Sequence, residues 1–149
     1  MIDYHWRGTF DNAEINALHA EGFGHPVSES NWIGRLERHS LGWVCARQAG
    51  ELIGFVNLVW DGGVHVFLVD TVVAKRVRHQ RAAAALVSVA APRAAAAGCQ
   101  WLHVDFEDHL AGFYFDACRF RPTQAGLLRL QEPSADPARS PSGDSPAEG

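Results

Sequence analysis

The chain has 149 residues, 47% of them hydrophobic, and a formal net charge of −4, which suits one domain with one core and argues against a nucleic-acid-binding protein. No uncharged apolar run approaches the roughly 20 residues of a membrane helix, and no apolar run near the N-terminus has signal-peptide length. Three cysteines at scattered spacings, with no CxxC pair, argue against a disulfide framework and a structural zinc site, so we expect a cytoplasmic protein.

The N-terminal part of the chain predicts one strand and two helices. Residues 2–6 (IDYHW) are few and large, which is typical of a strand. Residues 11–24 predict a helix in which Asp11 and Glu14 form a capping pair. Residues 28–39 repeat the apolar helical spacing more briefly and predict a second helix.

Three β-branched and aromatic runs follow, at residues 42–48, 51–60 and 64–73. The turn signals AG and DGG separate them, so they predict an antiparallel meander. The third run is apolar on both faces, which is typical of a strand covered on both sides.

A basic cluster (KRVRHQR, residues 75–81) precedes an alanine-rich helix predicted at 80–98. Gly98 suits the end of this helix, whereas Pro92 should kink or shorten it unless the helical register tolerates the ring. Residues 101–106 then predict a buried strand. A crossover helix joins it to the preceding strand, so the two should be parallel neighbours.

The C-terminal part predicts a second amphipathic helix at 108–118, capped by Asp108, and a closing strand or hairpin at 119–130. The whole order, βααβββαβαβ, predicts a single-domain α/β (α+β) fold with a mixed central sheet flanked by helices, over residues 1–131. Residues 132–149 hold four of the seven prolines and no large apolar side chain, so we expect a disordered Pro/Ser-rich tail.

From about Trp6 to Leu130 this order resembles the GNAT superfamily of acyl-coenzyme A dependent N-acetyltransferases. In that family a central strand D-x-x-V-x-P leads to a loop R-x-x-G-x-G/A at the start of a long helix. The sequence DTVVAKRVRHQRAAAALV places Asp70, Val73 and Arg78 at matching positions. The resemblance implies a GNAT-like sheet, acetyl-CoA as co-substrate and a pyrophosphate-binding loop at the basic cluster.

The loop departs from the family pattern at Arg81, which stands at the first glycine, and at Lys75, which stands at the proline. Ala83 stands at the second glycine, where the family tolerates alanine. Arg81 could fill the phosphate volume or add a charge-assisted contact to it, and the basic cluster could instead be solvated loop charge. The resemblance implies these cofactor-binding residues: Thr71, Val72, Val73, Arg78, His79, Gln80, Arg81, Ala82 and Ala83.

The family often places a tyrosine on the helix after the following strand as a general acid. Counting back from Phe120 puts Phe115 at that position, and a difference of one residue at the helix end would put Tyr114 there, so we choose Tyr114. Its alternative role is that of an amphipathic core residue with a hydroxyl partner. The family also places a carboxylate near Asp70, whose apolar alternate neighbours should bury it and make it a readier proton acceptor. Asp70 is therefore the candidate general base, and its alternative role is a structural carboxylate; deprotonation through water, without one dedicated base, is the other alternative.

The stretch HVDFEDH alternates His103, Asp105 and Glu107 along one predicted strand face, with His109 nearby. These side chains could line an amine-binding surface or bind a metal. Metal ligation needs convergence that alternation alone does not give, so we assign no metal.

The resemblance predicts an N-acetyltransferase that moves an acetyl group from acetyl-CoA to a primary amine on a small molecule or peptide. The alternative is a catalytically inactive module of the same fold that binds acyl-CoA or a protein partner. The sequence gives no reason to expect nucleic acid or a membrane as partner, and it leaves the oligomeric state open, a homodimer included.

Overall fold

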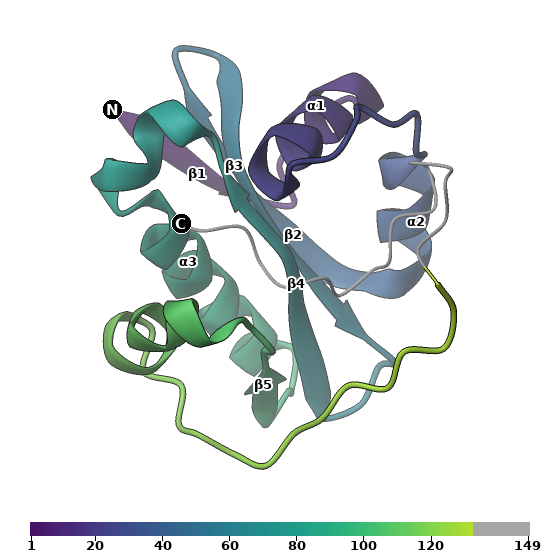
Figure 1. Ribbon diagram of the computed structural model, residues 1–149, viewed down its shortest axis with the longest axis vertical. Helices are drawn as coiled ribbons and strands as arrows, with labels where there is room; N and C mark the ends of the chain where they lie inside the picture. The colour runs from purple at the N-terminus through teal and green to yellow at the C-terminus, as the bar shows by residue number, and fades with distance from the viewer. Residues whose placement is uncertain (133–149) are drawn as a thin grey trace.

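The computed structural model describes residues 1–132, with all of their side chains except those of His79 and Gln80 (Figure 1). The expected tail from residue 133 onward lies outside the described residues. No helix in the described part is long and apolar enough to cross a membrane. The elements in chain order are β1 (Ile2–Trp6), α1 (Asn12–Phe23), α2 (Trp32–His39), β2 (Ser40–Gln48), β3 (Glu51–Trp60), β4 (His65–Val73), η1 (Lys75–Gln80), α3 (Ala82–Ala96), β5 (Trp101–His103), η2 (Asp108–Leu110) and η3 (Gly112–Ala117).

The five strands form one mixed sheet in the order β1-β2-β3-β4-β5. The first four strands pair antiparallel, and β4 pairs parallel with β5 after the α3 crossover. These pairings confirm the predicted meander and the predicted parallel neighbour. Because β4 lies between β3 and β5, backbone partners flank the start of this strand on both edges.

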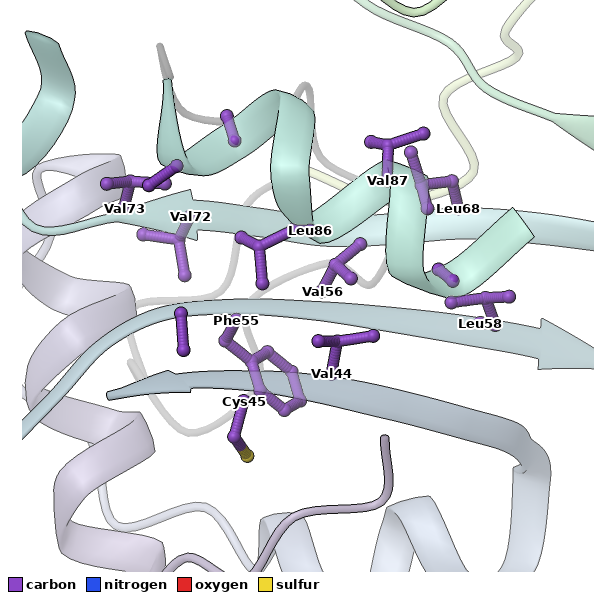
Figure 2. Close-up of a cluster of buried hydrophobic side chains, with 14 of the residues drawn as sticks. Val44, Cys45, Phe55, Val56, Leu58, Leu68, Val72, Val73, Leu86 and Val87 are labelled. Atoms are coloured by element: carbon purple, nitrogen blue, oxygen red, sulfur yellow. The ribbon is translucent and has the colours of Figure 1, made fainter. Parts of the chain in front are cut away.

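Helices cover both faces of the sheet, with α1 and α2 on one side and α3 on the other (Figure 1). On the first side, the Trp32 ring of α2 lies 6.0 Å from the Phe55 ring of β3 in an edge contact. On the second side, Leu86 of α3 points toward the sheet, where it lies beside Val56 of β3 (Figure 2). Leu86 and Val56 are fully buried, and burying each such side chain is worth about 1.5–3 kcal/mol.

A glycine in β2 makes room for an aromatic ring from the edge strand. Trp6 of β1 lies directly over Gly42, where an added Cβ would come within 2.3 Å of two atoms of the indole. No real Cβ contact is that short, so the absence of a side chain at Gly42 is what seats the Trp6 ring.

The ends of α1 and α3 follow local signals in the sequence. The side chain of Asp11 accepts from the backbone N–H of Glu14, and the carboxylate of Glu14 accepts from the N–H of Asp11, which confirms the capping box. Helix α3 ends as expected, because Gly98 is left-handed (φ +96°) and its N–H bonds to Ala95 O.

Pro92 does not shorten the long helix, because α3 runs without interruption from Ala82 to Ala96. Pro92 is exposed, and so is Ser88, whose carbonyl would have accepted the missing hydrogen bond. Water can satisfy that carbonyl, so the ring is tolerated on the outer face of the helix.

The C-terminal part differs most from the predictions. Strand β5 stops at His103 instead of residue 106, and its pairing with β4 ends at Phe67. The predicted helix at 108–118 is a 3-10 turn followed by a π-helix, and Asp108 makes no side-chain cap. Within the described residues no strand forms at 119–130, where the side chains of three leucines are more than four-fifths exposed: Leu127, Leu128 and Leu130.

Candidate active site

A bulge in β4 places the two residues at the centre of the candidate site. Val69 pairs with Asn57 and Val72 with Phe55, so two residues of β4, Asp70 and Thr71, oppose a single residue of β3. Asp70 is left-handed (φ +56°), a conformation that aspartate tolerates better than most residues. The bulge turns the Asp70 side chain toward α1 and α2.

The Asp70 carboxylate is 4% exposed and has three polar neighbours. Oδ1 lies 3.3 Å from His19 Nε2 of α1, and Oδ2 accepts from Asn57 Nδ2 of β3 at 3.4 Å. The guanidinium of Arg35 on α2 lies 3.9 Å from Oδ2. A buried carboxylate needs such partners, so α1, α2 and β3 jointly hold Asp70 in place.

The structure adds two histidines that the sequence interpretation did not select. His19 Nδ1 lies 2.6 Å from His25 Nε2, and His25 Nδ1 lies 2.7 Å from the carbonyl oxygen of Pro26. His19 is buried and His25 partly exposed. One signal was available, because His19 falls four residues after Ile15 on the apolar face of the predicted helix, where a histidine needs a polar partner.

The loop after β4 is a short 3-10 helix, η1, that leads directly into α3. Arg81, between the two helices, is left-handed (φ +57°) with an exposed side chain. The backbone here adopts the conformation for which glycine is the usual residue. Among the described side chains none caps α3, and the first N–H groups of a helix have no partner within the helix itself.

The cations of the loop have different surroundings. Arg76 is paired with Glu51, and the backbone N–H of Lys75 donates to Glu21 at 3.0 Å. Nε of Arg78 is buried and has no hydrogen-bond partner among the described residues. A buried N–H donor normally has a hydrogen-bond partner, so Nε of Arg78 points to an acceptor that lies outside the described residues.

The remaining proposed cofactor-binding residues lie close to the loop along the chain. The side chains of Val72, Val73, Ala82 and Ala83 are all buried. His79 and Gln80 belong to η1, but their side chains lie outside the described part of the structure.

Tyr114 is packed in an aromatic cluster and is 1% exposed. Its ring stacks on Phe106 at 4.6 Å and meets Phe120 edge-on at 5.8 Å. Burial raises the pKa of Tyr114 well above its usual value, and the side chain of Thr71 partly opposes this shift. Thr71 Oγ1 is buried without a partner at normal hydrogen-bond distance among the described residues.

Asp70 and Thr71 therefore point to different surroundings. Asp70 reaches the helices α1 and α2, whereas Thr71 lies by Tyr114 of η3. The two candidate catalytic side chains, Asp70 and Tyr114, have no direct contact in the structure. Phe115 is half-buried, with its ring 5.2 Å from that of Phe106.

The polar residues of HVDFEDH separate into unrelated contacts. His103 Nε2 lies 2.8 Å from His65 Nδ1, and burial, with a smaller effect from His65, lowers the pKa of His103. Glu107 lies 3.5 Å from His109, while Asp105 Oδ2 is buried without a partner among the described residues. Within the described part no three such side chains converge as metal ligands.

A five-stranded mixed sheet with this β4–loop–α3 crossover is the fold of the acetyltransferases. The chain belongs to the acetyltransferase (GNAT) family, which it matches over residues 7–118. This confirms the family resemblance and the single-domain fold class expected from the sequence. No curated protein matches the chain in sequence.

Solved structures share the fold at low sequence identity. An acetyltransferase from Trypanosoma brucei has a TM-score of 0.75 at 17% identity, with 89% of this chain and 100% of that chain covered. The ribosomal-protein-alanine N-acetyltransferase of Brucella melitensis biovar Abortus has a TM-score of 0.68 at 19% identity, covering 87% and 100%. AAC(6′)-Iy, solved with the bisubstrate analogue CoA-S-monomethyl-acetylneamine, has a TM-score of 0.63 at 18% identity, covering 89% and 99%.

Proposed function

We propose that the protein is an N-acetyltransferase that uses acetyl-CoA and acetylates a primary amine on a small molecule or peptide. The observation that carries this proposal is the passage from the bulged strand β4 through η1 into an uncapped helix α3. Family membership supplies the reaction class, and this passage supplies a binding site for the phosphates of the co-substrate.

The residues of the passage fit a pyrophosphate in three ways. The first N–H groups of α3 are free to donate to phosphate oxygens, and the helix dipole adds a partial positive charge there. The orphaned Nε of Arg78 needs an acceptor. The side chain of Arg81 is exposed, which favours a charge-assisted contact to the pyrophosphate over filling of the phosphate volume. The side chains of His79 and Gln80 stay part of the proposed loop.

The backbone of β4 would hold the arm of the co-substrate. Strand β5 pairs with only three residues of β4, His65 to Phe67. Beyond Phe67, the edge of β4 that faces away from β3 therefore has no strand partner among the described residues. Thr71, Val72 and Val73 lie on this stretch, and their backbone groups would bind the pantetheine arm and the acyl carbonyl.

The reaction needs a neutral amine and a proton for the departing thiolate, and acetyl-CoA supplies the acyl thioester. We assign Asp70 as the general base that takes a proton from the incoming ammonium group. We assign Tyr114 as the general acid, because its phenol, protonated at neutral pH, lies beside Thr71 on the stretch of β4 that would hold the thioester. The buried, unpartnered hydroxyl of Thr71 lies beside it and would help to position that phenol.

The test is calorimetric titration of acetyl-CoA into the full chain, followed by assay of thiol release with a panel of amines. The panel holds an aminoglycoside, an amino sugar and a peptide with an N-terminal alanine. Binding followed by amine-dependent thiol release supports the proposal. Absence of binding would remove acetyl-CoA as co-substrate, and binding without thiol release for any amine would favour the inactive module.

The inactive module remains the second candidate because Asp70 and Tyr114 are both nearly inaccessible and make no contact with each other. Asp70→Asn and Tyr114→Phe separate the two candidates. In an enzyme both substitutions lower the rate of thiol release more than the affinity for acetyl-CoA. In a binding module there is no catalysed thiol release for either substitution to lower. We also propose that the protein is cytoplasmic, as expected from the sequence.

A further inference from the structure

Three side chains form a continuous line from the core to the surface. Asp70 Oδ1 lies 3.3 Å from His19 Nε2, and His19 Nδ1 lies 2.6 Å from His25 Nε2. We call this line the Asp–His–His chain. Asp70 and His19 are buried, while His25 is partly exposed, so one end lies at the bulge of β4 and the other reaches water.

The hydrogen bonds fix how many protons the Asp–His–His chain holds. The Pro26 carbonyl oxygen can only accept, so His25 Nδ1 must carry a hydrogen. If His25 is neutral, its Nε2 accepts from His19 Nδ1, and the contact between His19 Nε2 and Asp70 then needs one more hydrogen. That mobile proton can reside on Asp70, on His19 or on His25 without breaking the line.

Removing the mobile proton leaves two lone pairs facing each other, on His19 Nε2 and on the Asp70 carboxylate. Returning one proton converts this unfavourable contact into a hydrogen bond. The depleted chain therefore gains a hydrogen bond when a proton arrives at the Asp70 end.

The groups around the chain confine the proton to its length. Arg35 of α2 is the charged group that faces Asp70, and Asn57 of β3 donates to the same oxygen. The His19 ring packs against two uncharged rings, that of Phe23 at 4.4 Å and that of Trp32 at 5.2 Å. Within the described residues, the titratable groups hydrogen-bonded to His19 are the other two members of the chain.

We propose that the Asp–His–His chain takes up the proton of the acceptor ammonium group at the β4 bulge and shares it among its three members until the product has left. The inference rests on the proposed acetyltransferase function and adds two positioning residues, His19 and His25, to the candidate base Asp70. The N–H bond of the ammonium breaks, its electron pair stays on nitrogen for attack on the thioester, and an O–H bond forms on Asp70.

The proton then moves along the chain without any further reactant. Asp70 passes it to His19 Nε2, and His19 can in turn release the hydrogen on Nδ1 to His25 Nε2, while the Nδ1–H of His25 stays bonded to the Pro26 carbonyl oxygen. Both nitrogens of His25 are engaged, so the proton leaves by the reverse hops, from Asp70 to water once the product has left, and this restores the depleted form.

The test compares His19→Gln and His25→Gln with the matched control His39→Gln, whose side chain is exposed at the end of α2. Acetylation of the amine that the panel selects is followed from about pH 6 to about pH 10, which covers the imidazole range and approaches that of an alkyl amine. Thermal melting and acetyl-CoA affinity show that each variant is folded. His25→Gln keeps the test decisive if His19→Gln does not fold, because His25 is partly exposed.

We expect His19→Gln and His25→Gln to lower kcat about 10- to 100-fold near neutral pH, with the KM for acetyl-CoA within about twofold of wild type. The deficit should shrink as the pH rises, because the amine then arrives without its extra proton. His39→Gln should match wild type at every pH. Wild-type kcat in both variants, or a deficit that is equal at every pH, would overturn the proposal.

Nuclear magnetic resonance of ¹⁵N-labelled histidine rings gives a second readout that needs no acceptor. A shared mobile proton requires the ring signals of His19 and His25 to change together with pH, and Asp70→Asn to alter both. Independent changes would overturn the chain even in an active enzyme. A wild-type protein that fails to bind acetyl-CoA in the calorimeter would refute the proposed function itself, and this inference with it.

Discussion

Replacing Arg81 tests both the conformation and the charge of the proposed pyrophosphate loop. Arg81 is left-handed, which costs a non-glycine residue about 1–2 kcal/mol. Glycine removes that cost but loses about 0.4–1 kcal/mol through the greater freedom of the unfolded chain. Arg81→Gly should therefore be about 0.5–1 kcal/mol more stable than Arg81→Ala, which keeps the Cβ and its strain.

The same pair of variants measures the role of the guanidinium. If Arg81 contacts the pyrophosphate, both variants lose a charge-assisted hydrogen bond worth about 1.5–3 kcal/mol, so the Kd for acetyl-CoA should rise about 10- to 100-fold in each. Arg38→Ala, an exposed cation on α2, is the control and should leave the Kd unchanged. Stability comes from denaturant unfolding and affinity from calorimetry.

Two results would refute this reasoning. Equal unfolding free energies for Arg81→Gly and Arg81→Ala would mean that the strain of the left-handed conformation is no larger than the about 0.4–1 kcal/mol that glycine loses through the unfolded chain. Tighter binding of acetyl-CoA by both variants would mean that the arginine blocks the phosphate volume, and the search for function should then turn to partners of an inactive module.

Three further predictions use other parts of the molecule. Arg47 lowers the pKa of Glu14, so Glu14→Gln should lower the free energy of unfolding at neutral pH. Urea unfolding should show this difference from wild type fading as the pH falls through the carboxyl range, and a difference that stays constant with pH would contradict the reasoning. Burial raises the pKa of Cys45 to about 12, whereas Cys99 is only partly buried. Iodoacetamide should therefore modify Cys99 before Cys45 in peptide mass mapping, and faster labelling of Cys45 would be the contrary result. Tyr114→Phe should fold and bind acetyl-CoA like wild type while releasing thiol about 10- to 100-fold more slowly, and an unchanged rate would remove Tyr114 as general acid.

The elements up to residue 98 could be predicted because their signals are local. A capping box, glycine-containing turns and the change from helical to alternating apolar spacing each act within a few residues. The C-terminal part could not, because its structure depends on distant partners. Strand β5 extends only as far as its pairing with β4, which ends before the bulge at Asp70.

The candidate site was predictable where the family pattern reached it, at Asp70 and the loop leading to Arg81. Its tertiary partners were not, because His19 is 51 residues away from Asp70 along the chain. Nothing near His19 in the sequence indicates a carboxylate partner. The bulge that brings the two together is equally hidden, since Asp70 lies in an otherwise regular strand sequence.

The contact between Trp6 and Gly42 makes these two positions dependent on each other through evolution. Any side chain at residue 42 would displace the indole, so Gly42 can change only after Trp6 has become smaller. The order of substitutions is then constrained: the single change Gly42→Ala should be strongly destabilising, while the same change in a Trp6→Val background should cost far less. Related sequences that differ here should show both positions changed together, so that β1 and β2 evolve together at this contact.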